Sequence, residues 1–252
     1  MKRLVIPSLL LAALASWAAN PHLAVVARKN VAVGGFTPAD LSPVLWLSDT
    51  GADTGTWPDI SGEGNDFTQT NETWKPAIIA AAQNGLQVRR FDGILDTLEY
   101  TGQIISSGPG TCFVVFKVED DPPIFAQSSG PLVDMGTSGA ADHIPYTDGT
   151  IYSGFGSTVR KNCGDSAATM TNWMVLTIQS NTNDWELWIN RTSEFSTASN
   201  TIGWGSAPRI GSSELAVVEM EGDIAEIILV PSVVSDANRT NVWDWLESKW
   251  AL

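Results

Sequence analysis

The feature that most constrains this fold is a succession of short apolar runs that begins after Leu41. Gly, Asp, Asn, Ser and Pro separate the runs, and apolar runs bounded by such residues are typical of β-strands. With only one convincing helix among them, this spacing predicts an all-β domain, an antiparallel sandwich or jelly roll of two sheets. The expected strands lie in VLWLSD (44–49), GLQVRRFD (85–92), TLEYT (97–101), TCFVVFKV (111–118), WMVLTIQS (173–180), DWELWIN (184–190), PRIGSS (208–213) and DIAEIILV (223–230).

The last of these runs leads into the one expected helix. Pro231 ends the strand, and Ser235 is placed to cap a helix that starts at Asp236. A mainly apolar stripe then recurs every three or four residues, so the helix packs on the domain through one side. The stripe consists of Val242, Trp245, Leu246 and Lys249.

Alternation along a strand assigns side chains to faces. In DWELWIN, Trp185, Leu187 and Ile189 point to one face, which we take as the core face. Trp188 then points to the other face, where it meets solvent or an interface.

Charge is distributed unevenly along the 252 residues. Hydrophobic residues make up 43% of the chain and charged residues 17%, a balance that excludes a disordered chain. The formal net charge is −14, and all 28 Asp and Glu residues lie beyond residue 39. Because an acidic body repels phosphate backbones, we expect no nucleic-acid partner.

Residues 1–40 differ from the rest of the chain. Lys2 and Arg3 precede the apolar segment 4–19, which has the outline of a secretory signal peptide and is short for a membrane span. Residues 20–40 lack helical periodicity and are typical of an extended arm or linker. Two interpretations stay open: cleavage as a signal peptide, or retention as an anchor to partner subunits.

The two cysteines, Cys112 and Cys163, are too few to fix the redox compartment. Cys112 lies on the face of its strand that excludes Lys117, so its thiol is expected to be buried, and its pairing with Cys163 stays open. His22 and His143 are the only histidines, which disfavours a zinc site. Neither accompanies the G-x-S-x-G elbow that would indicate a catalytic triad.

The segment DISGEGNDF (59–67) is dense in turn-forming residues. Gly62 and Gly64 can take positive φ, and short polar side chains can bond nearby backbone amides. We therefore interpret it as a tight structural loop. The alternative is a calcium site, because oxygen ligands suit that ion, although the spacing matches no fixed calcium motif. The ligands of such a site would be Asp59, Asn65 and Asp66.

Acidic residues before and within the last expected strand could form the carboxylate pair of a glycoside hydrolase. Glycosidases need two carboxylates at a fixed separation, and Glu219, Glu221 and Asp223 alternate along one segment. A solvated hairpin rim explains the same pattern, and we prefer that interpretation. Glu226 interrupts an apolar run on the face of Ile224, and we interpret it as a structural hydrogen-bonding residue.

Sugar binding would use exposed aromatic rings that stack on pyranose faces beside polar side chains. The candidates are aromatic residues near polar or Gly-rich stretches, and packing in the core or at a subunit interface is the alternative role for each. The four candidates are Trp57, Tyr152, Trp188 and Trp204.

The order of these motifs resembles a known family. Residues 41–252 are similar to the laminin-G-like branch of the concanavalin A-like lectin/glucanase superfamily, in the version found in bacteriophage structural proteins. The resemblance rests on VLWLSD, DISGEGNDF, VRRFDG, FVVFKV, GDIAE and the final helix ending in Lys-Trp. It implies a two-sheet jelly roll whose concave face or rim loops hold sugars in some relatives.

The sequence departs from the family pattern at two turns. Asn190 and Arg191 replace an Asn-Gly hairpin, so we expect another turn geometry or a longer loop there. Ala251 stands where the pattern has glycine after the final tryptophan. These changes affect turn and cap detail and leave the fold assignment unchanged.

The resemblance implies a function. We expect a non-enzymatic virion surface protein of a tailed phage, a capsid decoration, head fibre or tail fibre component, with glycan or host-surface binding through the jelly roll. Residues 1–40 would join it to other virion proteins, and the surplus of tryptophans favours a homo-oligomer such as a trimer. No cofactor is expected, calcium aside. The alternatives are a secreted bacterial carbohydrate-binding module and a glucanase-like glycoside hydrolase.

Overall fold

The structure is a computed structural model that describes residues 35–122, 132–213 and 218–252. Both interpretations of the N-terminal arm concern residues that lie almost entirely outside the described ranges. The described part starts with a short 3-10 helix, η1 (Pro38–Leu41). Within the described ranges, no helix is both long enough and apolar enough to cross a membrane.

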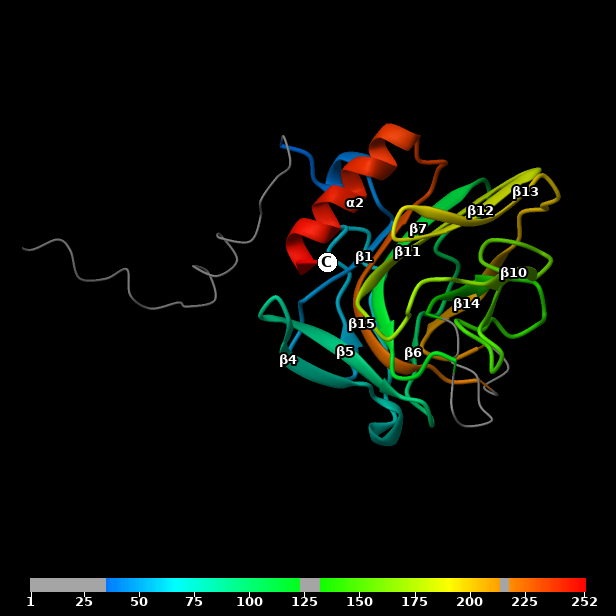
Figure 1. The fold of residues 1–252 in the computed structure, drawn as a ribbon. Helices are drawn as coiled ribbons and strands as arrows, with labels where there is room; N and C mark the ends of the chain where they lie inside the picture. Colours follow the sequence, from blue (N-terminus) through cyan, green and yellow to red (C-terminus); the bar gives the residue numbers. More distant parts are fainter. Residues whose placement is uncertain (1–34, 123–131, 214–217) are drawn as a thin grey trace, which may run out of the picture.

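The larger of the two main sheets has eight strands, all paired antiparallel. The strands follow the order β13-β12-β11-β7-β15-β5-β4, and β1 pairs with β15 beside this path (Figure 1). Their bounds are β1 (Leu45–Leu47), β4 (Ala77–Gln83), β5 (Leu86–Asp92), β7 (Gly110–Val118), β11 (Met174–Asn181), β12 (Asp184–Ile189), β13 (Thr192–Thr197) and β15 (Glu221–Val230).

The second sheet has five short strands in the order β2-β3-β6-β14-β8, and β9 and β10 form a separate two-stranded sheet. The structure confirms an all-β fold of the jelly-roll type, and each of the eight expected runs overlaps a strand. The remaining elements are β2 (Thr56–Trp57), β3 (Phe67–Thr68), η2 (Glu72–Trp74), β6 (Leu98–Glu99), β8 (Asp134–Gly136), β9 (Thr150–Ser153), β10 (Lys161–Asp165) and β14 (Trp204–Ile210).

The main hydrophobic core lies between the two sheets. Alternation along β7 places Cys112 and Val114 in this core and Phe113 and Val115 on the opposite face. The expected burial of Cys112 is confirmed, because its side chain is 2% exposed. Cys163 is buried as well, and both thiols are free.

Helix α2 (Asp236–Trp250) covers the outer face of the eight-stranded sheet (Figure 1). As expected, Ser235 caps it, since its Oγ accepts a hydrogen bond from the N–H of Asn238 at 3.4 Å. Val242 of the expected stripe is fully buried against the sheet. Trp188 lies on the predicted face of β12, but the expectation of solvent contact is wrong, because the ring packs in the cluster beneath α2 and is 5% exposed.

Glu226 fastens α2 to the sheet. Its carboxylate is 0% exposed and accepts three hydrogen bonds of 2.6 Å, from Trp46 Nε1, Trp250 Nε1 and Lys249 Nζ. The predicted structural role is therefore confirmed. The expectation that Glu226 shares a face with Ile224 is wrong, because the register of β15 against β7 shifts between these two residues and Ile224 packs between the sheets.

The β12–β13 hairpin turns in two residues, Asn190 and Arg191, where we expected another geometry or a longer loop. Both have positive φ, 46° and 71°, as a type I′ turn requires. Arg191 adopts this conformation without being glycine. Its guanidinium contacts the carboxylates of Asp244 and Glu247 on α2, each at 2.6 Å, so the turn is tied to the helix.

Candidate functional site

Three of the four aromatic residues expected to bind sugars are buried. Trp57 is 1% exposed, and its Nε1–H donates to the carbonyl of Ser48 at 2.6 Å. Trp204 is 7% exposed, and its Nε1–H donates to the carbonyl of Gly108 at 2.9 Å. With Trp188 beneath α2, none of the three presents an open ring face, and each has the packing role that was the alternative for these candidates. Trp57 and Trp204 instead donate hydrogen bonds to loop carbonyls, and Trp188 packs between the sheet and α2.

The loop that contains the calcium candidates is held by its own hydrogen bonds. The carboxylate of Asp59 accepts from the N–H groups of Trp46, Ser61 and Asn65 at 2.8 to 3.0 Å. The carboxylate of Asp66 accepts from the N–H of Asp59 at 2.7 Å. Across the residues described, no group of three or more His, Cys, Asp or Glu is arranged to hold a metal ion. The geometry agrees with the structural interpretation of this loop.

The alternating acids do not form a set of free carboxylates. Asp223 is 1% exposed and is paired with Arg90 at 2.7 Å and with Lys117 at 3.5 Å. Glu221 is exposed, and desolvation together with neighbouring acids raises its pKa, as desolvation does for Glu219. Because Asp223 is neutralised by two cations, the arrangement favours a rim with structural ion pairs over a pair of catalytic acids.

Tyr152 lies in a cluster of rings that we call the tyrosine patch, formed by His143, Tyr146, Tyr152 and Arg160. The three rings meet edge to face, with the centroids of Tyr146 and Tyr152 5.8 Å apart and that of His143 4.9 Å and 5.9 Å from them. The guanidinium of Arg160 lies 4.7 Å from the Tyr152 centroid. Tyr146 is 39% exposed and Tyr152 is half-buried. The patch therefore offers solvent both ring surface and a cationic hydrogen-bond donor.

Backbone pairing brings the members of the patch together. His143 and Tyr152 exchange N–H to C=O hydrogen bonds of 2.8 and 2.9 Å. Between them the chain reverses at Tyr146, whose carbonyl accepts from the N–H of Gly149 at 2.9 Å. The φ of Gly149 is +87°, a conformation that favours glycine. Arg160 directly precedes β10, which pairs with β9. Three neighbouring segments therefore supply the patch: the segment before β9, β9 itself and the start of β10.

Arg160 carries the positive charge of the patch. Burial, and then the charge of Arg160, lower the pKa of His143 to about 4, so this imidazole is neutral at pH 7. Arg160 Nη1 donates to the carbonyl of Ala141, which fixes the guanidinium against the ring. A guanidinium has five donors, so it can also meet the hydroxyl or carboxylate oxygens of a ligand.

Asp142 directly precedes His143 of the patch, and its side chain is 3% exposed. Its carboxylate accepts from Ser153 Oγ at 3.0 Å and from the N–H of Gly154 at 2.7 Å. Burial, and then the charge of Asp134, raise its pKa to about 8 despite these bonds. The carboxyl group that accepts these two hydrogen bonds at the end of β9 is thus largely protonated at neutral pH.

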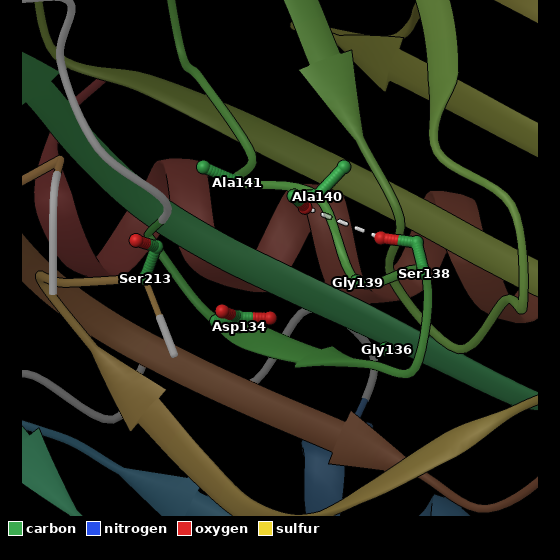
Figure 2. Close-up of a pocket in the computed structure, with 7 residues that line it drawn as sticks. All are labelled: Asp134, Gly136, Ser138, Gly139, Ala140, Ala141 and Ser213. Atoms are coloured by element: carbon green, nitrogen blue, oxygen red, sulfur yellow. Dashed lines mark hydrogen bonds between the residues drawn. The ribbon is translucent and has the colours of Figure 1, made fainter. Parts of the chain in front are cut away.

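A small pocket is lined in part by residues 138–141, which come shortly before His143 of the patch in the chain (Figure 2). Asp134, Ser138 and Ser213 supply its polar side chains, and glycine and alanine form much of the rest. Ala141 connects the pocket with the patch, because it lines the pocket and its carbonyl accepts a hydrogen bond from Arg160.

Of the tyrosine patch, sequence analysis named only Tyr152 as a ligand-binding candidate. His143 was considered for zinc and catalysis alone, and Tyr146 and Arg160 were not considered. A signal was present, because two of the three tyrosines in the chain lie within seven residues of each other, beside a turn that contains Asp148 and Gly149.

No family model matches the chain, and no curated protein matches it. Solved structures do match. The binding domain of botulinum neurotoxin serotype D is 12% identical, with a TM-score of 0.58, and the match covers 81% of this chain and 51% of that one. The receptor-binding domain of botulinum neurotoxin mosaic serotype C/D is 13% identical, with a TM-score of 0.61, over 82% and 51% of the two chains.

Trypanosoma rangeli sialidase is 11% identical to this chain, with a TM-score of 0.55, over 81% of this chain and 32% of the enzyme. The chain therefore spans about half the length of the toxin domains and a third of the sialidase. At such low identities the likeness shows the fold alone, an antiparallel β-sandwich. Neither a laminin G domain nor a phage protein is among the structures named here.

Proposed function

We propose that this protein is a non-enzymatic binding module and that its tyrosine patch holds a glycan. The observation that carries the proposal is the clustering of Tyr146, Tyr152 and Arg160, with the ring of Tyr146 39% exposed. Flat aromatic rings stack on the apolar faces of pyranoses, and a guanidinium supplies directional bonds to sugar oxygens.

The expected affinity is modest. An aromatic contact contributes about 0.5–1.5 kcal/mol beyond its buried area, so a patch of two tyrosines and one arginine suits a dissociation constant of about 0.1 to 1 mM for one sugar unit. Display of several copies on one particle would raise the effective affinity by a factor of about a hundred or more without new contacts. Weak single sites suit a protein that binds a surface crowded with glycans.

The comparisons lend this proposal support of a limited kind. The matched toxin chains are named as binding and receptor-binding domains, and the matched sialidase was solved with sialic acid. Those activities belong to whole proteins that this chain matches in part. Between binding and hydrolysis we favour binding. The carboxylate of Asp223 is held in ion pairs with Arg90 and Lys117, so it does not serve as a free catalytic acid.

We further propose that the module is displayed on the virion of a tailed phage, attached through residues 1–40. Its motif order resembles phage structural proteins, and an apolar, basic arm precedes an acidic body. A secreted bacterial carbohydrate-binding module is the alternative. Mass spectrometry of purified virions tests the choice: the intact polypeptide in the particle supports the proposal, and its absence there, with a processed form in the medium, overturns it.

The glycan proposal is tested by array screening followed by calorimetry with the best oligosaccharide. Tyr146→Ala should weaken binding at least tenfold, because it removes the most exposed ring of the patch. The matched control is Leu252→Ala, since this side chain is also 39% exposed but follows α2 and lies outside the patch, and it should bind like wild type. The proposal fails if wild type retains no glycan, or if Tyr146→Ala and Leu252→Ala bind alike.

A further inference from the structure

A second exposed apolar region lies beside β4, at one end of the large sheet, whereas the tyrosine patch is built around the separate β9–β10 sheet. Three of the exposed large hydrophobic residues are Trp74 (38%), Ile94 (67%) and Leu95 (44%). They flank the base of the β4–β5 hairpin, because η2 ends just before β4 and the loop after β5 contains Ile94. The N–H of Thr97 donates to the carbonyl of Trp74 at 3.0 Å, which joins these two segments.

Strand β4 is the last strand at one end of the eight-stranded sheet. Its sequence, AIIAAAQ, contains no charged residue, and Ala77, Ala80 and Ala81 are exposed. It pairs with β5 on one side, and no described strand pairs with its other side (Figure 1). An uncharged edge strand presents backbone N–H and C=O groups that can pair with another chain.

The opposite end of the same sheet is built differently. Strand β13 carries Glu194 within it and follows Arg191. Charged residues on an edge strand disfavour pairing with another sheet. The two ends therefore differ in a way that favours one of them as a contact surface.

We propose that a second copy of this chain docks on the apolar edge, defined as Trp74, strand β4, Ile94 and Leu95. A chain with a net charge of −14 repels its own copies over most of its surface, so an uncharged strand is where two copies can approach. Antiparallel pairing of β4 with β4 of a second copy uses the same residues on both sides, as a twofold dimer requires. Apolar side chains at the base of the hairpin then become buried.

The contact is short along the backbone. The register of β4 against β5 shifts between Ile79 and Gln83, and Ala81 has a φ of 53°. This bulge leaves Ala77 to Ile79 as the regular part of the edge. Regular backbone pairing therefore covers only these three residues, and Trp74, Ile94 and Leu95 supply most of the apolar area.

The test is the concentration dependence of the mass of the full chain, by sedimentation equilibrium from about 1 to 100 µM. Wild type should associate to dimers or to even multiples of them. Ala80→Glu places a carboxylate on the exposed edge and should raise the dissociation constant at least tenfold. Ser196→Glu adds the same charge to exposed β13 and is the matched control, which should associate like wild type.

A neutral variant at the same position sharpens the result. Ala80→Gln should associate like wild type, because it adds a side chain of similar size without the charge. Near-UV circular dichroism checks that each variant is folded. A wild-type monomer at every concentration overturns the proposal, and so does an oligomer that Ala80→Glu leaves intact or that Ser196→Glu disrupts equally. Association that needs a foreign peptide would assign the edge to another partner and also overturn it.

Discussion

The helix-covered face of the large sheet and the tyrosine patch are both rich in aromatic rings, yet they differ in what their polar atoms do. Beneath and beside α2, the indole N–H groups of Trp46 and Trp250 donate to Glu226, and that of Trp243 donates to Thr177 Oγ1 at 2.9 Å. In the tyrosine patch the rings contact one another, and Tyr146 remains 39% exposed. An aromatic ring is a candidate for ligand contact when its face is open, whatever the local composition.

The largest effect should come from the helix-covered face. Glu226→Ala leaves the ammonium group of Lys249 with less compensation and leaves two indole N–H groups without their acceptor. Removing one partner of a buried ion pair typically costs about 3–5 kcal/mol, and we expect about 3 kcal/mol here because Asp49 stays 3.2 Å from Lys249. Urea denaturation measures the loss.

Two controls tell whether the two regions are independent. Glu247→Ala removes a partly exposed contact with Arg191 and should cost less than about 1 kcal/mol. Glycan affinity of folded Glu226→Ala should equal that of wild type. A large loss of glycan binding in folded protein would show that the two regions are coupled and would break the comparison.

An intermediate effect concerns the pH dependence of stability at the tyrosine end. The pKa of Asp142 is raised to about 8 in the folded state from 3.8, so the folded chain keeps a proton that the unfolded chain has lost. The contribution of this proton to stability is full below about pH 3.8 and is lost as pH rises towards 8. His143 opposes this slope only below pH 6.5, because its folded pKa is lowered to about 4.

The clean window is therefore pH 6.5 to 8, where stability should fall as pH rises, by at most about 1.4 kcal/mol per pH unit. Asp142→Asn keeps an acceptor for the N–H of Gly154 and should flatten the curve in this window. Denaturation midpoints at half-unit steps of pH measure both slopes. Equal slopes in wild type and Asp142→Asn would contradict the assignment.

The smallest effect should come from the end of α2. Ala251 has φ and ψ of 54°, and its N–H donates to the carbonyl of Glu247. The left-handed conformation costs a non-glycine residue about 1–2 kcal/mol, part of which glycine loses again through its greater freedom in the unfolded chain. Ala251→Gly should therefore stabilise the protein by about 0.5–1 kcal/mol. A thermal midpoint equal to or below that of wild type would contradict this expectation.

The strands were predictable because their signal is local. Runs such as TCFVVFKV are apolar and β-branched, and short turn-rich segments separate them. Strand β4 was missed because alanine favours helices, although Asn84 and Gly85 after it, with φ of 47° and 71°, form an Asn-Gly turn. The bulge before Glu226 was missed because strict alternation has no place for an extra residue.

The candidate site was predictable only in part, because exposure depends on layers that sequence does not show. Alternation put Trp188 on the correct face, but only the packing of α2 decides that this face is covered. Trp57 and Trp204 lie near polar residues in sequence and point inward in space. His143 and Arg160 join Tyr152 because β9 pairs with the segment before it and with β10, which the sequence alone does not show.

The central position of β15 has a consequence for how this chain is made. β1, β5 and β7 all pair with it, through contacts such as Leu45 with Leu229 and Phe113 with Ile228. Partners more than a hundred residues apart close slowly, and none of these ladders can form until residues 221–230 have left the ribosome. Until then β5 and β7 lack the strand that lies between them, so incomplete nascent chains should be the species most prone to aggregate.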